Sequence, residues 1–211
     1  MANNFKIRCY LIVKRLFDFI VSLVALIFVI PITLVIWAID QVGDNKGPVF
    51  YKQKRIGKGH KTFFIFKYRS MVKDADQRLK DNQELYDLYV SNSYKLPPEM
   101  DPRITKFGEL LRKTSLDELP QFFNILKGDM SLIGPRPVVE EELRMYGTDA
   151  DKFLSVVPGA MGYWQASGRS NINYPERCDL ELFYVDHASM WFDLKVLYKN
   201  IISIFKQDGA Y

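Results

Sequence analysis

The feature that most constrains the fold of this chain is an apolar tract at residues 19–38, twenty consecutive positions without a charged side chain. The only polar types in it are Ser22 and Thr33. A helix of about 20 residues is long enough to cross the hydrocarbon core of a bilayer. The tract is longer than the apolar region of a signal peptide, and no A-x-A cleavage pattern follows it. We therefore interpret it as a retained membrane anchor.

The surroundings of this tract leave two arrangements open. Pro31 lies near its middle, where a proline kinks or ends a helix. Basic residues flank it on both sides, at positions 6, 8, 14 and 15 and again at positions 46, 52, 54, 55, 58 and 61. The positive-inside rule would keep both flanks in the cytoplasm, which a re-entrant helix–break–helix in one leaflet satisfies. A kinked spanning helix is the commoner arrangement for such a tract.

The remaining composition limits the class of protein. A length of 211 residues allows one domain with a hydrophobic core, or a smaller domain plus an anchor. Two cysteines make no disulfide framework, so we expect a reducing compartment. Two histidines exclude a histidine-rich metal site and disfavour a Ser-His-Asp hydrolase. The net charge of +4 is modest and clusters near the anchor, so we expect membrane lipid and no nucleic acid as a partner.

The rest of the chain predicts a mainly α fold with a small β-hairpin. Residues 48–57 and 61–68 are β-prone runs around a glycine-containing turn. The charged residues 72–101 predict a surface helix and a loop. An apolar stripe on residues 191–205, opposed by lysines, predicts a helix that packs on the core or lies in the membrane interface. We expect residues 1–45 to form the membrane hairpin and residues 46–211 a globular α+β domain on the cytoplasmic side.

The run KTSLDELPQFFN at residues 113–124 carries the strongest chemical signal. Asp117 and Glu118 are adjacent carboxylates, which repel each other unless a cation or a helix N-terminus takes up their charge. One interpretation is a capping box between Ser115 and Glu118. Pro120 would then stand inside the helix, so a helix that begins at Asp117 or Glu118 suits the proline better. The pair also suits chemistry on a phosphate beside a divalent metal, and local physics does not decide.

Two later loops contain further candidates. Pro135 and Pro137 enclose Arg136 in a rigid segment, and a fixed guanidinium suits forked recognition of phosphate oxygens. The loop at residues 158–170 brings together an aromatic ring, an amide and a guanidinium that suit a nucleotide base and its phosphates. These three groups belong to Trp164, Gln165 and Arg169. Taken alone, each of these loops is more simply an ordinary structural loop.

Several segments occur here in one order: FYKQKRIG (50–57), FKYRSM (66–71), DPRITKFG (101–108), RKTSLDELPQ (112–121) and NILKGDMSLIGPRP (124–137). Together with residues 158–170 and 179–193 they resemble the bacterial sugar transferase family, the monotopic polyprenyl-phosphate phosphoglycosyl transferases. The resemblance covers nearly the whole chain from about residue 14 onward. So many ordered motifs make agreement by chance very improbable.

This resemblance implies transfer of a phosphosugar from a UDP-sugar to a polyprenyl (undecaprenyl) phosphate, the first membrane step of polysaccharide or glycan assembly. It places the protein at the cytoplasmic face of a bacterial plasma membrane. It makes Asp117 the nucleophile that forms a phosphosugar-aspartate, and it gives Glu118 a part in holding Mg²⁺. The expected phosphate- and substrate-binding residues are Lys67, Arg69, Arg112, Pro135, Arg136, Pro137, Gln165 and Arg169.

The chain also departs from the family pattern. Ile30 precedes Pro31 where relatives often have serine, and Tyr68 stands where many have phenylalanine. The loop at residues 162–165 also varies, which leaves the choice of sugar open. The alternative function is a non-catalytic membrane scaffold of the same fold, but a scaffold has no need of both acidic residues and both arginines. The sequence is compatible with a homo-oligomer.

Overall fold

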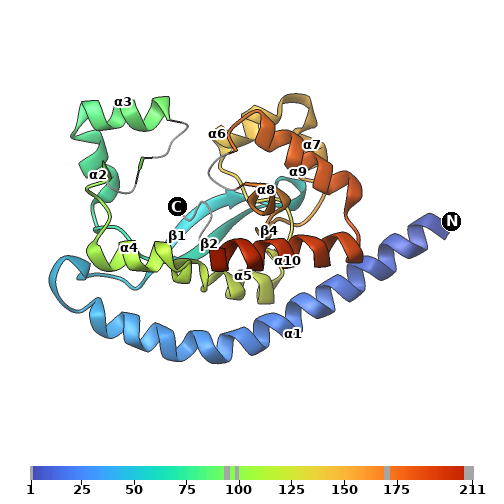
Figure 1. Cartoon of the computed structure of the whole chain (residues 1–211), viewed down its shortest axis with the longest axis horizontal. Helices are drawn as coiled ribbons and strands as arrows, with labels where there is room; N and C mark the ends of the chain where they lie inside the picture. The colour runs from blue at the N-terminus through green and yellow to red at the C-terminus, as the bar shows by residue number, and fades with distance from the viewer. Residues whose placement is uncertain (1, 93–95, 98–99, 169–171, 207–211) are drawn as a thin grey trace.

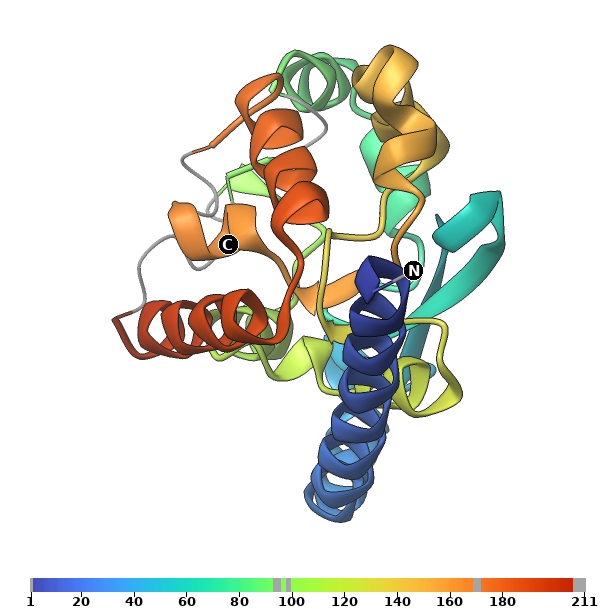
Figure 2. The ribbon, with the colours of Figure 1, turned by 90° about the vertical axis from the view of Figure 1, so that its right-hand side faces the viewer.

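The computed structural model describes residues 2–92, 96–97, 100–168 and 172–206. Its largest element is helix α1 (Ala2–Ile39), which passes beneath the rest of the molecule (Figure 1). Viewed from the N-terminal end of α1, the lower part of this helix projects beyond the globular part (Figure 2). In the described part of the chain, α1 is the one helix long and apolar enough to cross a membrane by length and composition.

The expected break at Pro31 is not observed. Helix α1 is a single helix with Pro31 inside it, and it is bowed with its convex side away from the globular part (Figure 1). Near the proline, the hydroxyl of Thr33 donates to the carbonyl oxygen of Val29 at 2.7 Å. A helix in apolar surroundings has few other partners for its backbone, so it bends at proline more readily than it separates into two helices.

One face of α1 docks on the globular part through polar contacts. The carboxylate of Asp193 accepts hydrogen bonds from the hydroxyl of Tyr10 at 2.8 Å and from the ammonium of Lys14 at 2.6 Å. One turn further, the carboxylate of Asp18 accepts the backbone N–H of Leu132 at 2.9 Å. The buried face continues with Ser22, Leu26, Val29 and Ile36. Because these residues recur at helical spacing, the opposite face of α1 carries the exposed apolar side chains.

The predicted hairpin is confirmed, and a second sheet accompanies it. Strands β1 (Phe50–Ile56) and β2 (Thr62–Tyr68) pair antiparallel around a short turn, η2 (Lys58–His60). Strands β3 (Ser131–Ile133) and β4 (Gly159–Met161) pair in parallel. A Cβ atom on Gly159 would lie 2.1 Å from the backbone nitrogen of Gly134, so the two chain segments approach closely only because both residues are glycine.

The remaining elements are mostly short helices. They are η1 (Gly43–Asn45), α2 (Ala75–Lys80), α3 (Gln83–Ser91), α4 (Lys106–Lys113), η4 (Leu116–Glu118), α5 (Gln121–Lys127), α6 (Glu140–Leu143), η5 (Arg144–Asp149), α7 (Ala150–Phe153), α8 (Tyr163–Ser167), α9 (Glu176–His187) and α10 (Met190–Lys206). The mainly helical fold with small sheets therefore agrees with the sequence. Two short helices, α2 and α3, stand where one surface helix was expected.

Helix α10 buries Asp193, Val196 and Asn200, which lie outside the apolar stripe that the sequence pattern indicated, and most of that stripe is exposed. Val196 is fully buried in the core that Phe63, Ile125 and Tyr184 also form. On the other face, Trp191 is 83% exposed. A helix with a buried face and an exposed apolar face suits a position between the core and a lipid surface.

Helix α4 approaches the end of β2 closely at Gly108. A Cβ atom on Gly108 would lie 1.8 Å from the carbonyl oxygen of Ser70. Thr105 caps the helix, since its hydroxyl accepts the N–H of Gly108 at 2.9 Å. This approach also lets the Nε of Arg112 donate to the hydroxyl of Ser70 at 2.8 Å. The glycine thus sets the position of a residue that the sequence assigns to the site.

We predict that Gly108→Ala destabilises the protein. Alanine in a helix is ordinarily favoured over glycine, but here its Cβ would collide with a backbone oxygen, and overpacking of this kind costs about 1–3 kcal/mol. Thermal unfolding in lipid nanodiscs would measure the change. Lys106→Ala, at an exposed position of the same helix, is the control and should leave the unfolding temperature nearly unchanged. Equal stability of Gly108→Ala and wild type would contradict the close approach.

Candidate active site

The two carboxylates lie in a tight turn between two helices. Ser115 adopts a left-handed backbone conformation with φ of 55°, and η4 follows with Asp117 and Glu118. Helix α5 begins only after Pro120, which is its N-cap residue. Both interpretations of this run from the sequence were therefore inexact: Ser115 makes no side-chain capping bond, and the acids precede the α-helix instead of forming its first turn. Helix α5 ends at Gly128, which adopts a left-handed backbone conformation with φ of 95°.

Asn124 fixes this turn against the hairpin. Its side-chain oxygen accepts the N–H of Phe66 at 3.0 Å, and its side-chain nitrogen donates to the carbonyl oxygen of Phe64 at 2.7 Å. The amide thereby pairs with the edge of β2 as a neighbouring strand would, and it is fully buried. Sequence reasoning gave Asn124 no role, because a side chain that replaces a strand partner leaves no periodic signal.

The same hairpin edge supplies a cation to the acidic pair. The ammonium of Lys67, on β2, donates to a carboxylate oxygen of Glu118 at 2.7 Å. Burial alone would raise the pKa of Glu118, but the charges of Lys67 and Arg136 outweigh burial and hold that pKa below its ordinary value. Glu118 is therefore ionised at neutral pH.

The environment acts in the opposite direction on Asp117. Burial and the neighbouring charge of Glu118 raise the pKa of Asp117, while the charges of Lys67 and Arg112 lower it by less. The two neighbouring carboxyls thus have pKa values shifted apart, an arrangement that is frequent at catalytic sites. An ionised carboxylate held near cations has the chemistry of an oxygen nucleophile that needs no general base, and Asp117 meets this description once it loses its proton.

A cleft opens beside Glu118, and its charged lining is mostly cationic. The lining residues are Arg55, Ile65, Lys67, Glu118, Gln121, Arg136, Pro137, Gly159 and Ala160. No described residue hydrogen-bonds the half-buried guanidinium of Arg136, so that group is available to a ligand. Three cations against one carboxylate suit a ligand with several negative oxygens, such as a diphosphate.

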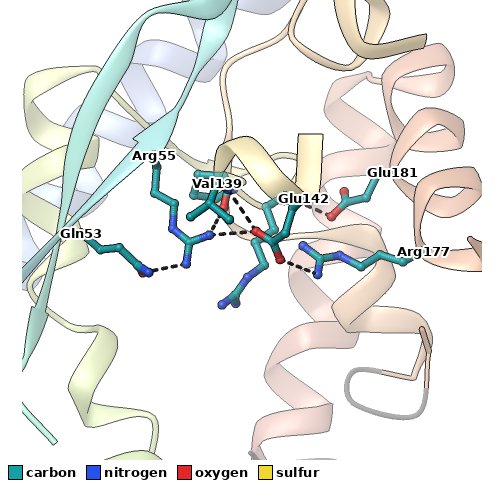
Figure 3. Close-up of polar contacts among 8 residues, drawn as sticks. Gln53, Arg55, Val139, Glu142, Arg177 and Glu181 are labelled. Carbon is teal, nitrogen blue, oxygen red and sulfur yellow. Dashed lines mark hydrogen bonds and ion pairs between the residues drawn. The ribbon is translucent and has the colours of Figure 1, made fainter. Parts of the chain in front are cut away.

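Arg55 is a cleft residue that the sequence reasoning missed as a site residue. Its guanidinium donates to the carboxylate of Glu142 at 2.9 Å and to the side chain of Gln53 at 2.7 Å (Figure 3). Arg55 belongs to the FYKQKRIG segment that contributed to the family resemblance, and that was the available signal.

Two of the expected binding residues make contacts outside the cleft. The guanidinium of Arg69 donates to the carbonyl oxygens of Pro48 at 2.8 Å and Met71 at 3.0 Å, and it pairs with Asp40 at 3.3 Å. The side chain of Gln165 accepts the N–H of Gly162 and so caps its own helix. Their role in substrate binding stays a prediction.

The other expected residues stand as follows. Arg112 lies on α4 beside Asp117, and Arg136 lines the cleft. Pro135 and Pro137 hold their neighbours through backbone carbonyls: Pro135 accepts the N–H of Gly159 at 2.8 Å, and Pro137 accepts from Arg55 at 3.3 Å. Arg169 lies outside the described residues.

The acidic pair is also the candidate metal site. The described residues contain no group of three or more His, Cys, Asp or Glu side chains that could by itself hold a metal ion. Magnesium commonly binds through one or two carboxylates plus substrate phosphates and water, and the hard oxygens of Asp117 and Glu118 fit that donor set. Lys67 already pairs with one oxygen of Glu118, so a bound ion would share this carboxylate with the lysine.

An acidic pair facing cations beside a long apolar helix defines a membrane-associated site suited to phosphorylated substrates. The chain belongs to the bacterial sugar transferase family, whose model matches residues 9–207. This match confirms the resemblance inferred from the ordered motifs.

Three relatives illustrate the range of the family. The undecaprenyl-phosphate galactose phosphotransferase of Salmonella typhimurium is 41% identical over 100% of this chain and 44% of its own. The exopolysaccharide production protein ExoY of Sinorhizobium fredii is 39% identical, over 94% of this chain and 88% of its own. The UDP-glucose:undecaprenyl-phosphate glucose-1-phosphate transferase of Xanthomonas campestris pv. campestris is 33% identical, over 96% and 40% respectively. The chain spans less than half the length of the first and third of these relatives.

The shifted pKa of Asp117 predicts how activity depends on pH. Burial and Glu118 raise this pKa to about 6, so Asp117 is mostly protonated below that pH and would then lack the charge that a nucleophilic role requires. We expect the rate of turnover to fall roughly tenfold per pH unit below about pH 6 and to level off above it. A pH–rate profile measures the midpoint.

A lysine variant tests the physical cause of that midpoint. Lys67→Met removes the cation that lowers the pKa of Asp117 most, so its profile should move to higher pH. Lys54→Met, at an exposed position of β1, is the matched control and should keep the wild-type midpoint. A midpoint unchanged in Lys67→Met would show that this lysine does not set the charge state of Asp117.

Proposed function

We propose that this protein transfers a phosphosugar from a UDP-sugar to a polyprenyl phosphate at the membrane surface, with UMP and a polyprenyl diphosphosugar as products. The observation that carries the proposal is the Asp117–Glu118 pair, which lies beside a cationic cleft in a chain with a long apolar helix. Two of the relatives named above support it, since their names specify a galactose phosphotransferase and a glucose-1-phosphate transferase of undecaprenyl phosphate.

The reaction has two displacements at one phosphorus atom. In the first, a carboxylate oxygen of Asp117 attacks the β-phosphorus of the UDP-sugar, and the bond from that phosphorus to the bridging oxygen breaks. UMP leaves with the bonding electron pair, and an acyl phosphate joins Asp117 to the sugar phosphate. In the second, an oxygen of the polyprenyl phosphate attacks the same phosphorus, and the carboxylate of Asp117 is released.

The cations around Asp117 have roles that follow from their positions. Phosphoryl transfer depends mainly on positioning and on neutralising charge, because the phosphate oxygens carry the developing negative charge. Arg136 and Lys67 line the cleft and would bind the diphosphate of the donor. Arg112 lies beside Asp117 and helps to keep that carboxyl ionised before attack.

Magnesium is part of the proposal. Glu118 would hold Mg²⁺, which would supply positive charge to the phosphate oxygens of the donor. Glu118 is suited to hold it because its pKa is lowered and it stays ionised across the physiological range.

We further propose that α1 is re-entrant and that the globular domain lies on the cytoplasmic face. The beginning of α1 contacts the domain through Tyr10 and Asp193, and the residue after its end, Asp40, pairs with Arg69 of the same domain. Since both ends of the helix dock on one body, a helix that entered from one side and left on the other would have to carry part of the domain through the membrane. The bowed shape in Figure 1 supports a helix that dips into one leaflet.

The lipid-facing surface has a consistent composition. On the outer face of α1 the middle part is strongly exposed, with Ile27 at 64% and Phe28 at 66%. On α10, Trp191 and Tyr198 are exposed as well, and such amphipathic rings favour the headgroup region. This arrangement would bring the phosphate of a polyprenyl chain to the height of the acidic pair.

We predict that Asp117→Asn abolishes UMP release. Asparagine has the same shape but no nucleophilic carboxylate, so the rate should fall by roughly three orders of magnitude or more. UMP release from a panel of UDP-sugars, with Mg²⁺ and polyprenyl phosphate, is the measurement, and it also identifies the sugar. Glu118→Gln is the companion variant, for which a weaker response to added Mg²⁺ is expected.

The outcomes separate the two functional hypotheses. Normal turnover by Asp117→Asn would show that another group is the nucleophile. If folded wild-type protein in lipid released UMP from no UDP-sugar, the non-catalytic scaffold would become the better interpretation.

The re-entrant arrangement predicts that both ends of α1 are on the cytoplasmic side. In a Cys9→Ser background, which leaves only the buried Cys178, we expect cysteines placed by Phe5→Cys or Asn45→Cys to react with an impermeant maleimide only after cell lysis. Lys58→Cys, exposed at the hairpin tip of the domain, is the cytoplasmic control. Labelling of residue 5 in intact cells, with residue 45 protected, would mean a spanning helix.

A further inference from the structure

The segment that carries Arg136 has a single backbone hydrogen-bond donor. Residues 135–137 read Pro-Arg-Pro, and proline has no backbone N–H, so only Arg136 can donate. That N–H donates to a carboxyl oxygen of Glu181 at 3.1 Å. Glu181 lies in the middle of α9 with an exposure of 0%. A buried acidic residue on a distant helix therefore holds the one donor of this segment.

Burying a carboxyl in this place is energetically unfavourable unless the carboxyl makes a hydrogen bond. No described residue pairs with the second carboxyl oxygen of Glu181, which is also buried. Burial raises the pKa of Glu181 to about 8, so the group is largely neutral at pH 7. A neutral carboxyl can accept the N–H of Arg136 without adding a second negative charge behind a cleft suited to a diphosphate. The amide of Arg136 is thus the one partner hydrogen-bonded to this carboxyl among the described residues.

A second acidic residue, Glu142, binds two arginines near this segment. Glu142 accepts from Arg55 at 2.9 Å and from Arg177 at 3.4 Å, and it lies between these two arginines (Figure 3). Arg177 is 2% exposed, and its guanidinium lies 4.5 Å from the ring centre of Trp164. Arg177 is therefore confined behind the cleft, while Arg136, held by its backbone, keeps its side chain free.

We propose that Glu181 is a positioning residue for Arg136: by accepting its backbone N–H, it fixes the Pro-Arg-Pro segment so that the guanidinium projects into the cleft and binds a nucleoside diphosphate. The inference rests on the proposed function, because it assigns Arg136 a phosphate to bind. Glu181 itself does not touch the substrate. It acts through the segment at the end of β3, opposite the turn that carries Asp117.

Two variants of similar volume separate the hydrogen bond from the packing. Glu181→Gln keeps an acceptor oxygen and resembles the neutral acid, so the Kd for UDP should stay within about twofold of wild type. Glu181→Met fills the same space without an acceptor and leaves the N–H of Arg136 unpaired, which should raise the Kd about tenfold. Asp179→Asn, at an exposed position of the same helix, is the control and should behave as wild type.

A double-mutant cycle tests whether Glu181 acts through Arg136. UDP binding is measured by calorimetry on the full chain in nanodiscs for wild type, Glu181→Met, Arg136→Ala and the double variant. We expect Glu181→Met to raise the Kd in the wild-type background but to add no further rise once Arg136 is alanine. Independent, additive effects would overturn the proposal, and so would equal losses in Glu181→Gln and Glu181→Met.

The same measurements separate this inference from the proposed function. If wild type binds UDP and the cycle shows coupling but no UDP-sugar yields UMP, the positioning role holds and the transferase proposal fails. If turnover is normal but the cycle is additive, the transferase proposal holds and the positioning role fails. If wild type does not bind UDP, Arg136 has no such ligand and the inference is wrong.

Discussion

The structure depends on how an apolar helix is fastened to a polar domain. Asp193 is nearly buried and receives the hydroxyl of Tyr10, the ammonium of Lys14 and the hydroxyl of Tyr184. Buried charges are tolerated only with such partners, so these contacts fix which face of α1 turns inward. Asp18 adds a bond to the backbone one turn further along the helix. Between residues 16 and 38 the exposed side chains of α1 are then all apolar, as a lipid environment requires.

This fastening reaches both sides of the candidate site. Arg15 of α1 donates to the carbonyl oxygens of Ile125 at 2.6 Å and Leu126 at 2.7 Å, near the end of the helix that follows the acidic turn. Asp18 holds β3, whose continuation is the segment with Arg136. The same helix, α1, therefore positions both the carboxylates and the arginine that faces them. Such a frame would set the distance of the site from a lipid surface, as the proposed polyprenyl acceptor requires.

The electrostatics of the site follow from an excess of positive charge. Lys67, Arg112 and Arg136 act on two adjacent carboxyls whose pKa values move in opposite directions. Glu118 stays ionised, whereas the raised pKa of Asp117 lies closer to neutral pH. Behind this layer, Glu142 and Glu181 keep the remaining arginines and the Pro-Arg-Pro backbone in place. The charged side chains that line the cleft are mostly cationic, whereas the charges of the residues behind it are neutralised by partners within the protein.

The sequence by itself determined the long apolar segment, the hairpin and the family, because apolar length, β-prone runs and ordered motifs are local signals. It also placed Asp117, Glu118, Lys67, Arg112 and Arg136 among the site residues, through motif and resemblance. Only the tertiary structure decided that α1 bends without a break, that Asn124 stands in for a strand, that Arg69 and Gln165 are engaged elsewhere, and that Glu181 holds Arg136. The contacts of Arg69 with Asp40, of Glu181 with Arg136 and of Asn124 with β2 join residues 29 to 60 positions apart, and no local pattern encodes such contacts.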